Sequence, residues 1–276
     1  MRLKSQKLNK GFTLLELLIV ISIMGLLAGM IMVSFPGVQK RARLAQALQF
    51  SDSLRGSLQM DMIGWWPLDE TSGTVAKDSW FDQNHGTLNG NPQWTEGVVN
   101  GALSFDGNGD YIAIPDSPLF NIQRLTIAAW VNFADNSSSF IFEKGNVNTQ
   151  YSLFSHGTDI VFRTVPTSGG YDTLSTSKTL AGINNDQWHF IVGIYDGVIK
   201  RLYVDGKLIL SRVWEYTINI NPNGSSIGRF GGTSAGYYFT GLIDNVQIYS
   251  IALPSATIQQ HYAEGLKTHP HLVIKY

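Results

Sequence analysis

The sequence predicts an α+β protein with one long N-terminal helix, first apolar and then amphipathic, followed by an antiparallel β-sandwich. In residues 12–35, Glu16 is the only ionisable side chain of an otherwise apolar run. From residue 62 onward helical spacing stops, and short β-rich runs alternate with clusters of Gly, Asn, Asp and Pro. Many short strands with tight turns and no intervening helices favour an antiparallel sandwich.

The apolar run exceeds the roughly 20 residues that a helix needs to cross a bilayer. Arg2, Lys4, Lys7 and Lys10 precede it without an acid, which predicts a cytoplasmic N-terminus. A carboxylate such as Glu16 is costly in hydrocarbon and indicates a function with a positively charged partner. A plain membrane anchor explains the hydrophobicity but not Glu16. A secretory signal peptide would have a shorter core and a small-x-small cleavage site.

The stretch Lys10-Gly11-Phe12-Thr13-Leu14-Leu15-Glu16, continuing Leu-Leu-Ile-Val-Ile, resembles the N-terminus of a type IV prepilin or pseudopilin. The resemblance implies that a prepilin peptidase cleaves between Gly11 and Phe12 and that the new Phe12 amine is methylated. Glu16 then neutralises the N-terminal amine of a neighbouring pilin subunit. Either charge alone would cost on the order of several kcal/mol in a dry helical bundle. The implied location is the cytoplasmic (inner) membrane, then an extracellular pilus or secretion pseudopilus.

The chain divides into four predicted segments. Residues 1–11 are the leader, and residues 12–61 are the N-terminal helix, of which 12–35 span the membrane. Residues 62–265 form the sandwich, and 266–276 are a tail. Pro36-Gly37 marks the place where the helix can kink. A stripe at i, i+3, i+7 and i+11 predicts that the second half of the helix packs against the globular domain; it comprises Ala47, Phe50, Leu54 and Leu58.

Alternating apolar residues predict ten strands in the sandwich. These are residues 102–105, 111–114, 125–132, 139–143, 151–155, 160–163, 188–195, 200–204, 207–214 and 239–249. Asp205-Gly206 lies between two of them and supplies the two residues with positive φ that a tight hairpin turn requires.

Three groups of motifs in the sandwich resemble the laminin-G-like, concanavalin A-like jelly roll. They are Gly64-Trp65-Trp66-Pro67-Leu68-Asp69-Glu70, Gly101-Ala102-Leu103-Ser104-Phe105-Asp106-Gly107 and Gly241-Leu242-Ile243-Asp244-Asn245-Val246-Gln247-Ile248-Tyr249. The resemblance covers about residues 63–265 and implies that fold. It also implies a closing helix with Pro254 in its first turn and Gly265 at its end. Such a fold specifies function only weakly.

Several function classes are disfavoured. The net charge of −1 gives no general attraction to nucleic acid, and the absence of cysteine excludes disulfides, thiolate metal sites and cysteine nucleophiles. Glycosidases require a pair of carboxylates. The Glu-x-Asp-x-Glu strand of related glucanases is absent, and no predicted strand carries two acids at alternating positions. We therefore expect a protein that is not an enzyme.

The jelly-roll resemblance implies a structural Ca²⁺ held by Asp78 and Asp244, with Asp106 as a weaker candidate. Calcium prefers six to eight oxygen ligands, which carboxylates and loop carbonyls supply. The alternative is that Asp78 caps a turn and Asp244 accepts backbone hydrogen bonds. His85 and His189 lie inside fold-associated motifs and are expected to be structural.

Aromatic residues in turn-like segments are candidates for ligand contact, although such residues also serve as lids over a core. They are Trp80, Phe81, Tyr171, Tyr237 and Tyr238. Trp80-Phe81 is preferred because it replaces small residues of the family pattern. The sequence therefore predicts a pilin-like filament subunit (pilin, minor pilin or pseudopilin) that displays a carbohydrate- or protein-binding domain for adhesion. One alternative is a structural filament coat or membrane-anchored surface domain without a ligand, and another is a glycan-acting enzyme.

Overall fold

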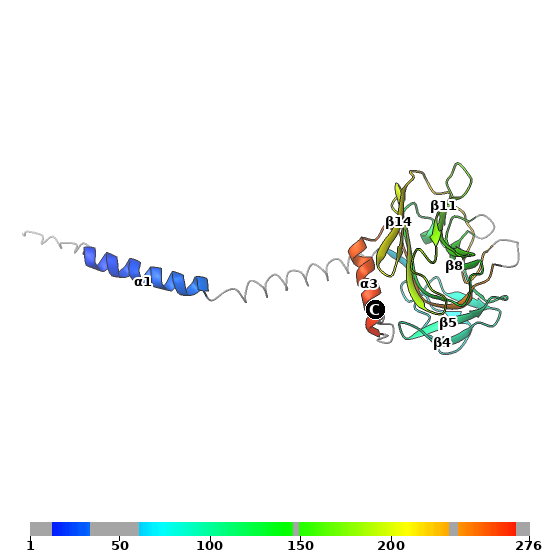
Figure 1. The fold of residues 1–276 in the computed structure, drawn as a ribbon, viewed down its shortest axis with the longest axis horizontal. Coiled ribbons are helices and arrows are strands. Elements are labelled where there is room, and N and C mark those ends of the chain that lie inside the picture. The colour runs from blue at the N-terminus through cyan, green and yellow to red at the C-terminus, as the bar shows by residue number, and fades with distance from the viewer. Residues whose placement is uncertain (1–12, 34–60, 146–148, 232–236, 269–276) are drawn as a thin grey trace, which may run out of the picture. The chain divides into compact units, whose positions relative to one another are not determined.

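The computed structural model describes residues 13–33, 61–145, 149–231 and 237–268 (Figure 1). Two compact units, residues 1–57 and 58–276, are treated separately. The predicted leader, the kink at Pro36-Gly37 and the apolar stripe of the second half-helix lie outside the described residues.

The described part of the first unit is helix α1 (Leu14–Val33). Thr13 precedes it, and Oε2 of Glu16 accepts hydrogen bonds from the Thr13 backbone N–H at 2.8 Å and from its hydroxyl at 2.9 Å. The Glu16 backbone N–H donates to the same hydroxyl at 3.3 Å. This reciprocal arrangement is a capping box, which satisfies donors that the first helical turn leaves free. Glu16 therefore has a role in its own helix that the sequence analysis did not foresee.

Over the described residues, no helix meets the length and hydropathy that a membrane crossing requires. The predicted span of 12–35 includes residues that are not described at either end.

The second unit is an antiparallel sandwich of two eight-stranded sheets. Sheet A has the order β14 (Lys207–Val213), β13 (Ile199–Val204), β12 (Trp188–Tyr195), β7 (Leu125–Phe133), β16 (Thr240–Tyr249), β5 (Gly101–Asp106) and β4 (Gln93–Glu96), and β1 (Met62–Trp66) pairs with β16. Sheet B has the order β11 (Asp172–Ser177), β10 (Asp159–Thr164), β9 (Tyr151–His156), β8 (Ser139–Lys144), β15 (Ser225–Ile227), β6 (Tyr111–Ile114), β3 (Gly86–Asn89) and β2 (Val75–Ala76).

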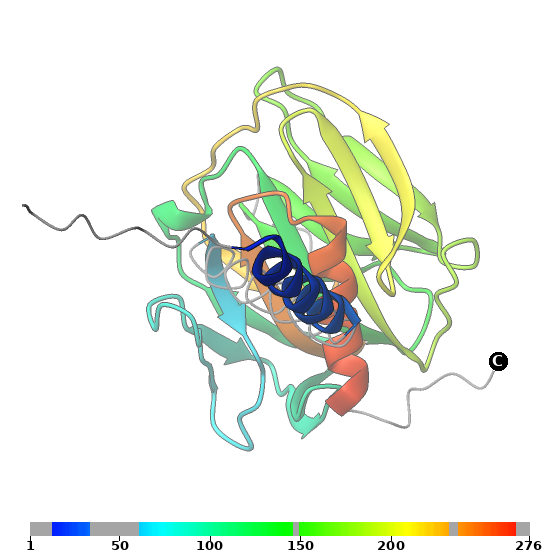
Figure 2. The same cartoon turned by 90° about the vertical axis from the view of Figure 1, so that its left-hand side faces the viewer.

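The main core lies between the two sheets and contains Trp66, Ile127, Phe142 and Phe162, all fully or almost fully buried. A second apolar cluster, which includes Trp130, Phe190 and Val192, lies on the other face of sheet A. Helix α3 (Ser255–Thr268) lies over this face (Figure 2). Trp130 stacks on Tyr262 of this helix with ring centroids 5.6 Å apart. Sheet A therefore packs against apolar clusters on both of its faces.

The ten predicted strands are confirmed to within one residue at each end. Asp205 and Gly206 have φ values of 51° and 74°, as the tight hairpin between β13 and β14 requires. Six strands were not predicted: β1, β2, β3, β4, β11 and β15. Strands β2 and β15 contain only two and three residues, too few to show alternation. In β11, Leu174 is the one buried apolar residue among Asp, Thr and Ser.

The predicted helix end at Gly265 is wrong, because α3 continues to Thr268. A Cβ atom at Gly265 would lie 2.4 Å from Cζ2 of Trp130. Glycine is therefore needed here so that α3 can approach the Trp130 ring closely. Pro254 directly precedes the helix, and its carbonyl accepts hydrogen bonds from the N–H groups of Thr257 and Ile258 at 3.0 and 3.2 Å.

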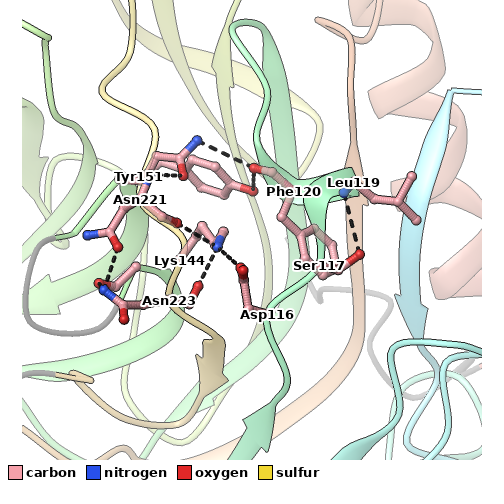
Figure 3. A network of polar contacts seen from close by, with 10 residues as sticks. Asp116, Ser117, Leu119, Phe120, Lys144, Tyr151, Asn221 and Asn223 are labelled. Atoms are coloured by element: carbon pink, nitrogen blue, oxygen red, sulfur yellow. Dashed lines mark hydrogen bonds and ion pairs between the residues drawn. The ribbon is translucent and has the colours of Figure 1, made fainter.

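A buried lysine at the end of the interior strand β8 joins two loops (Figure 3). The Lys144 side chain is fully buried, and its Nζ donates to Asp116 Oδ1 at 2.7 Å, to the Asn221 carbonyl at 3.0 Å and to the Asn223 carbonyl. Beside it, the Tyr151 hydroxyl donates to the Phe120 carbonyl at 3.0 Å. These bonds fix the segment containing η1 (Pro118–Phe120) and the segment before β15 to the same strand ends.

Candidate functional site

The predicted site residues of the N-terminus are only partly described. Gly11 and Phe12 lie outside the described residues, whereas Glu16 lies in the exposed first turn of α1. Their roles in leader cleavage, N-methylation and assembly stay predictions.

Asp78 is fully buried, and its carboxylate accepts hydrogen bonds within its own loop and from β1. Its Oδ1 accepts from the Trp65 and Trp80 backbone N–H groups at 3.1 and 3.0 Å. Its Oδ2 accepts from the backbone N–H and the side-chain amide of Asn84 at 3.3 and 3.2 Å. Four donors therefore already use both oxygens of Asp78, which ties β1 to the loop before β3.

The three predicted calcium residues do not form one site. Asp244 is buried on β16, and its Oδ2 accepts from the Val98 and Val99 N–H groups at 2.8 and 2.9 Å. Asp106 is exposed, and its Oδ1 accepts from the Asn108 N–H at 2.7 Å in the turn after β5. No group of three or more His, Cys, Asp or Glu side chains suited to a metal occurs among the described residues. The three residues therefore do not form one group, and calcium binding stays a prediction.

Asp244 differs from the other two because its Oδ1 is buried and has no hydrogen-bond partner among the described groups. Burial raises the pKa of the Asp244 carboxyl to about 8, although the Val99 and Val98 N–H groups lower it, and the charge of Asp69 raises it further. Below this pH the buried carboxyl is neutral, which removes the cost of an unpaired buried charge.

This raised pKa predicts that the sandwich becomes less stable as pH rises. The folded protein keeps a proton on Asp244 up to about pH 8, whereas the unfolded chain releases it near the ordinary pKa of 3.8. The folded state then binds more protons between pH 4 and 8, so Asp244 lowers the unfolding free energy by at most about 1.4 kcal/mol per pH unit in that window. Asp244→Asn should remove this slope in urea unfolding measured with a chelator, whereas Asp106→Asn should retain it. Equal slopes in the wild type and Asp244→Asn would contradict the assignment.

The five predicted ligand-contact aromatics fall into two groups. Trp80 packs against the apolar cluster on the outer face of sheet A, and its ring lies 5.9 Å from that of Phe81, which is 42% exposed. Trp80 thus serves as a lid over a core. Tyr171, Tyr237 and Tyr238 instead contact residues on the outer face of sheet B. Tyr171 is 62% and Tyr237 40% exposed.

A line of polar side chains crosses the outer face of sheet B. Strand alternation turns Phe142, Leu153 and Phe162 into the main core, so their neighbours face outward. The register pairs place the outward residues side by side, and we call them the polar row: Ser226 on β15, Glu143 on β8, Ser152 on β9, Arg163 on β10 and Thr173 on β11. Five strands at about 4.8 Å spacing give the row a length of roughly 19 Å.

An apolar cluster runs beside the polar row. Phe140, Phe154 and Val161 are buried on this outer face, with Phe230 packed against them. The Phe140 and Phe154 rings stack with centroids 4.4 Å apart. Tyr237 lies against Phe230 and Phe140 at centroid distances of 6.0 and 6.4 Å. The segments on both sides of residues 232–236 therefore cover part of the outer face of sheet B.

Glu143 is the acid of the polar row and is fully buried. Its carboxylate accepts hydrogen bonds from the Gly231 backbone N–H and the Thr149 hydroxyl. Burial raises the pKa of Glu143 to about 7, although these two donors and the charges of Arg163 and Arg229 lower it. Glu143 therefore titrates near neutral pH.

Two guanidinium groups lie near Glu143 and stack on aromatic rings. Arg163 Cζ lies 4.4 Å from the ring centroid of Phe154 and 4.6 Å from that of Tyr171. Arg229 Cζ lies 3.9 Å from the Tyr111 ring centroid. The Nε atoms of both arginines are buried without a hydrogen-bond partner, as is the hydroxyl of Ser152 between Glu143 and Arg163. Such stacking uses the faces of a guanidinium and leaves its in-plane N–H donors for an acceptor.

Glu143, Arg163 and Arg229 were not predicted as site residues from the sequence. They come from three separate segments, and only the strand register brings them together. One signal was present, since Glu143 follows the apolar run Phe140-Ile141-Phe142 on a strand that is buried throughout.

The two histidines of the fold motifs are structural, as expected. His85 Nδ1 accepts from the Asp78 N–H at 3.0 Å, and its Nε2 lies 3.2 Å from Asp82. His189 Nε2 accepts from the Asn184 N–H at 3.1 Å, so its Nδ1–H donates to Asp205 Oδ2 at 2.9 Å. Both ring nitrogens of each histidine are therefore engaged.

Two known families match two separate parts of the chain. Residues 6–32 match the prokaryotic N-terminal methylation motif. Residues 106–259, more than half of the chain, match the concanavalin A-like lectin/glucanases superfamily. The chain belongs to this superfamily. The chain thus joins an N-terminal methylation motif to a concanavalin A-like domain.

The curated relatives match one part each. The type IV major pilin protein PilE of Neisseria gonorrhoeae is 36% identical over 74 residues, which are 26% of this chain and 44% of the pilin. The adhesion G-protein coupled receptor V1 of Danio rerio is 27% identical over 190 residues, which are 63% of this chain and 3% of the receptor. The chain therefore spans less than half of the pilin and a small part of the receptor.

Solved structures share the fold of the concanavalin A-like domain at low identity. The binding domain of Paraclostridial Mosquitocidal Protein 1 aligns with a TM-score of 0.62 and 15% identity, covering 75% of this chain and 53% of that one. The receptor binding domain of a botulinum neurotoxin C/D mosaic serotype aligns at 0.61 and 14%, covering 75% and 52%. At such identity the likeness concerns the fold.

Proposed function

We propose that this protein is a type IV pilin-like filament subunit whose concanavalin A-like domain is displayed outside the cell and binds a carbohydrate or a protein in adhesion. The observation that carries the proposal is the joining of an N-terminal methylation motif at residues 6–32 to a lectin-like sandwich in one chain. A prepilin peptidase removes residues 1–11, and the helix keeps the subunit in the membrane until it joins other pilin subunits.

N-terminal mass spectrometry of sheared surface filaments tests the first part of the proposal. We expect a chain that begins at N-methylated Phe12, because cleavage after Gly11 exposes this amine for methylation. A chain that keeps its first eleven residues, or one found only in the membrane fraction, would contradict assembly and leave a membrane-anchored surface domain.

The outer face of sheet B supports a binding domain over a filament coat without a ligand. A filament coat requires only a stable folded surface, and the two paired sheets provide one. Here the Nε atoms of Arg163 and Arg229 lack partners, and Tyr171 and Tyr237 expose large parts of their rings. Unpaired buried donors cost free energy, so two unpaired guanidinium donors beside exposed tyrosines favour a surface that receives a ligand, although Trp80 and Arg212 also have a buried unpaired donor elsewhere.

We also propose that the domain does not hydrolyse glycans. Glycosidases hold two carboxyl groups about 5 to 9.5 Å apart. The polar row carries one acid, Glu143. Asp159 faces the same way as Arg163 but lies four residues before it on β10, roughly 13 Å along the strand. We expect no new reducing ends from neutral or acidic polysaccharides above the level of Glu143→Gln. Hydrolysis lost in that variant would make the domain an enzyme.

For calcium we propose a structural role at Asp244, supported by the one carboxylate oxygen there that lacks a partner. A bound cation favours the ionised carboxylate, so calcium should raise the melting temperature most at pH 8 to 9. Asp244→Asn should abolish the increase, and Asp78→Asn should retain it. An equal melting temperature in calcium and in chelator would contradict calcium binding at Asp244.

A further inference from the structure

We propose that Arg163 and Arg229 on the outer face of sheet B each form a subsite for an anionic group of an acidic polysaccharide. This inference rests on the proposal that the sandwich is a binding domain and gives that domain a place and a ligand class. Three independent features of the described residues lead to it. The two guanidinium groups lack a close acidic partner, Glu143 is already hydrogen-bonded to other groups, and tyrosine rings are exposed beside the arginines.

The two guanidinium groups lack an acidic partner at close range. The ion pairs of the sandwich join other cations to acids, such as Arg201 to Asp196 at 2.8 Å and Lys200 to Asp172 at 2.6 Å. Arg163 and Arg229 form no such pair within the described residues, and their Nε atoms are unbonded. Their planes are instead fixed by Phe154, Tyr171 and Tyr111. A guanidinium held in this way is preorganised to donate two parallel N–H bonds to a carboxylate or sulfate.

Glu143 forms no close ion pair with Arg163 or Arg229 in the described part of the chain. Its two oxygens already accept from Gly231 and Thr149, and it acts on both guanidinium groups through space. The two arginines and ionised Glu143 carry a net charge of +1 and therefore still attract an anion. The charged groups that act on Glu143 are Arg163 on β10 and Arg229 after β15. When Glu143 takes up a proton the net charge becomes +2.

The tyrosines favour a sugar as the carrier of the anionic group. Tyr171, 62% exposed, contacts Arg163, while Tyr238 lies beside Tyr111, the ring beneath Arg229, with centroids 6.4 Å apart. Exposed rings next to planar cations provide an apolar surface for a sugar ring beside a donor for its charged substituent. Ser226, Glu143 and Ser152 of the polar row are buried, so a polymer can contact the row at Arg163, beside the exposed Tyr171 ring.

Binding of the full-length chain in detergent micelles to defined polymers tests the proposal. Polygalacturonate should bind, and the same polymer with its carboxyl groups methyl-esterified should bind at least about tenfold more weakly, because esterification removes the charge and the bidentate acceptor. Dextran sulfate compared with dextran is the second arm, which tells a sulfate from a carboxylate. Binding to either anionic polymer with the arginine dependence below supports the subsite.

Arg163→Gln and Arg229→Gln should each weaken this binding at least about tenfold, as expected when one of two cations that each contact an anionic group of the polymer is lost. Arg163→Lys, which retains the charge but not the planar donor pair, should bind at an intermediate level and shows that the face still folds. The matched control is Arg124→Gln, an exposed arginine beside the β12–β13 turn that loses the same charge elsewhere. It should bind like the wild type.

The pH provides a second measurement. Wild-type binding of polygalacturonate should be tighter at pH 6 than at pH 8, and Glu143→Gln should bind equally at both. Equal binding of the esterified polymer, wild-type binding by both arginine variants, or equal losses in Arg124→Gln would overturn the proposal. Absence of binding to all four polymers would overturn it too, whereas the sheared-filament assay would still report on assembly, so the two proposals fail separately.

Discussion

Replacing Glu16 with glutamine is expected to remove the protein almost completely from sheared filaments while its amount in the membrane fraction stays unchanged. Glutamine, like glutamate, completes a capping box, so the hydrogen bonds with Thr13 at the start of α1 can be retained. What glutamine removes is the negative charge. In the proposed filament that charge neutralises the amine of the neighbouring subunit, and an unpaired buried charge is far costlier than a paired one.

Two further variants separate capping from charge pairing. Glu16→Ala removes both and should also be absent from filaments. Thr13→Ala weakens only the cap, at a cost of about 1 kcal/mol, and should still be incorporated. Quantification of the chain in sheared and membrane fractions decides the matter. Normal incorporation of Glu16→Gln, with loss only in Glu16→Ala, would assign Glu16 to its own helix and remove the intersubunit pairing.

The fold was largely predictable because its central strands are strongly apolar. Strand β7 and strand β12 are nearly continuous apolar runs, and their predicted bounds agree with the structure to within one residue. Strand β11 was not recognisable, because its Asp, Thr and Ser residues become a strand only through pairing with β10. Gly265 was misjudged for a similar reason, since its close contact with Trp130 is made across 135 positions of sequence and glycine is also common at helix ends.

The candidate site was predictable only in part, because a site on a sheet depends on register. The tyrosines at 171, 237 and 238 were recognised from composition, since large aromatics in turns are unusual. The arginines they accompany were not, because Arg163 reads as one charged residue in an ordinary strand. Its position beside Glu143 requires the pairing of β8 with β9 and of β9 with β10. A one-residue slip in either pair would place it on the opposite face.

Replacing Lys144 with methionine is expected to lower the free energy of unfolding by about 3–5 kcal/mol, the cost of removing one partner from a buried ion pair. The Lys144 ammonium is fully buried and donates to Asp116, Asn221 and Asn223 (Figure 3). Methionine fills most of the volume but leaves these acceptors without their donor. Both loops would lose their hydrogen bonds to the end of β8, so the effect should exceed that of any exposed charge change.

Urea unfolding at pH 7 measures this effect, with Lys207→Met as the matched control. Lys207 is exposed at the start of β14, so its replacement should change the unfolding free energy by less than about 0.5 kcal/mol. Asp116→Ala isolates the ion pair, because it leaves the two carbonyl acceptors of Lys144 in place. Since the Asp116 side chain is 34% exposed and can be hydrated, Asp116→Ala should cost less than Lys144→Met. Equal losses in those two variants would instead make the ion pair, and not the attachment of the Asn221–Asn223 segment, the main source of the stability.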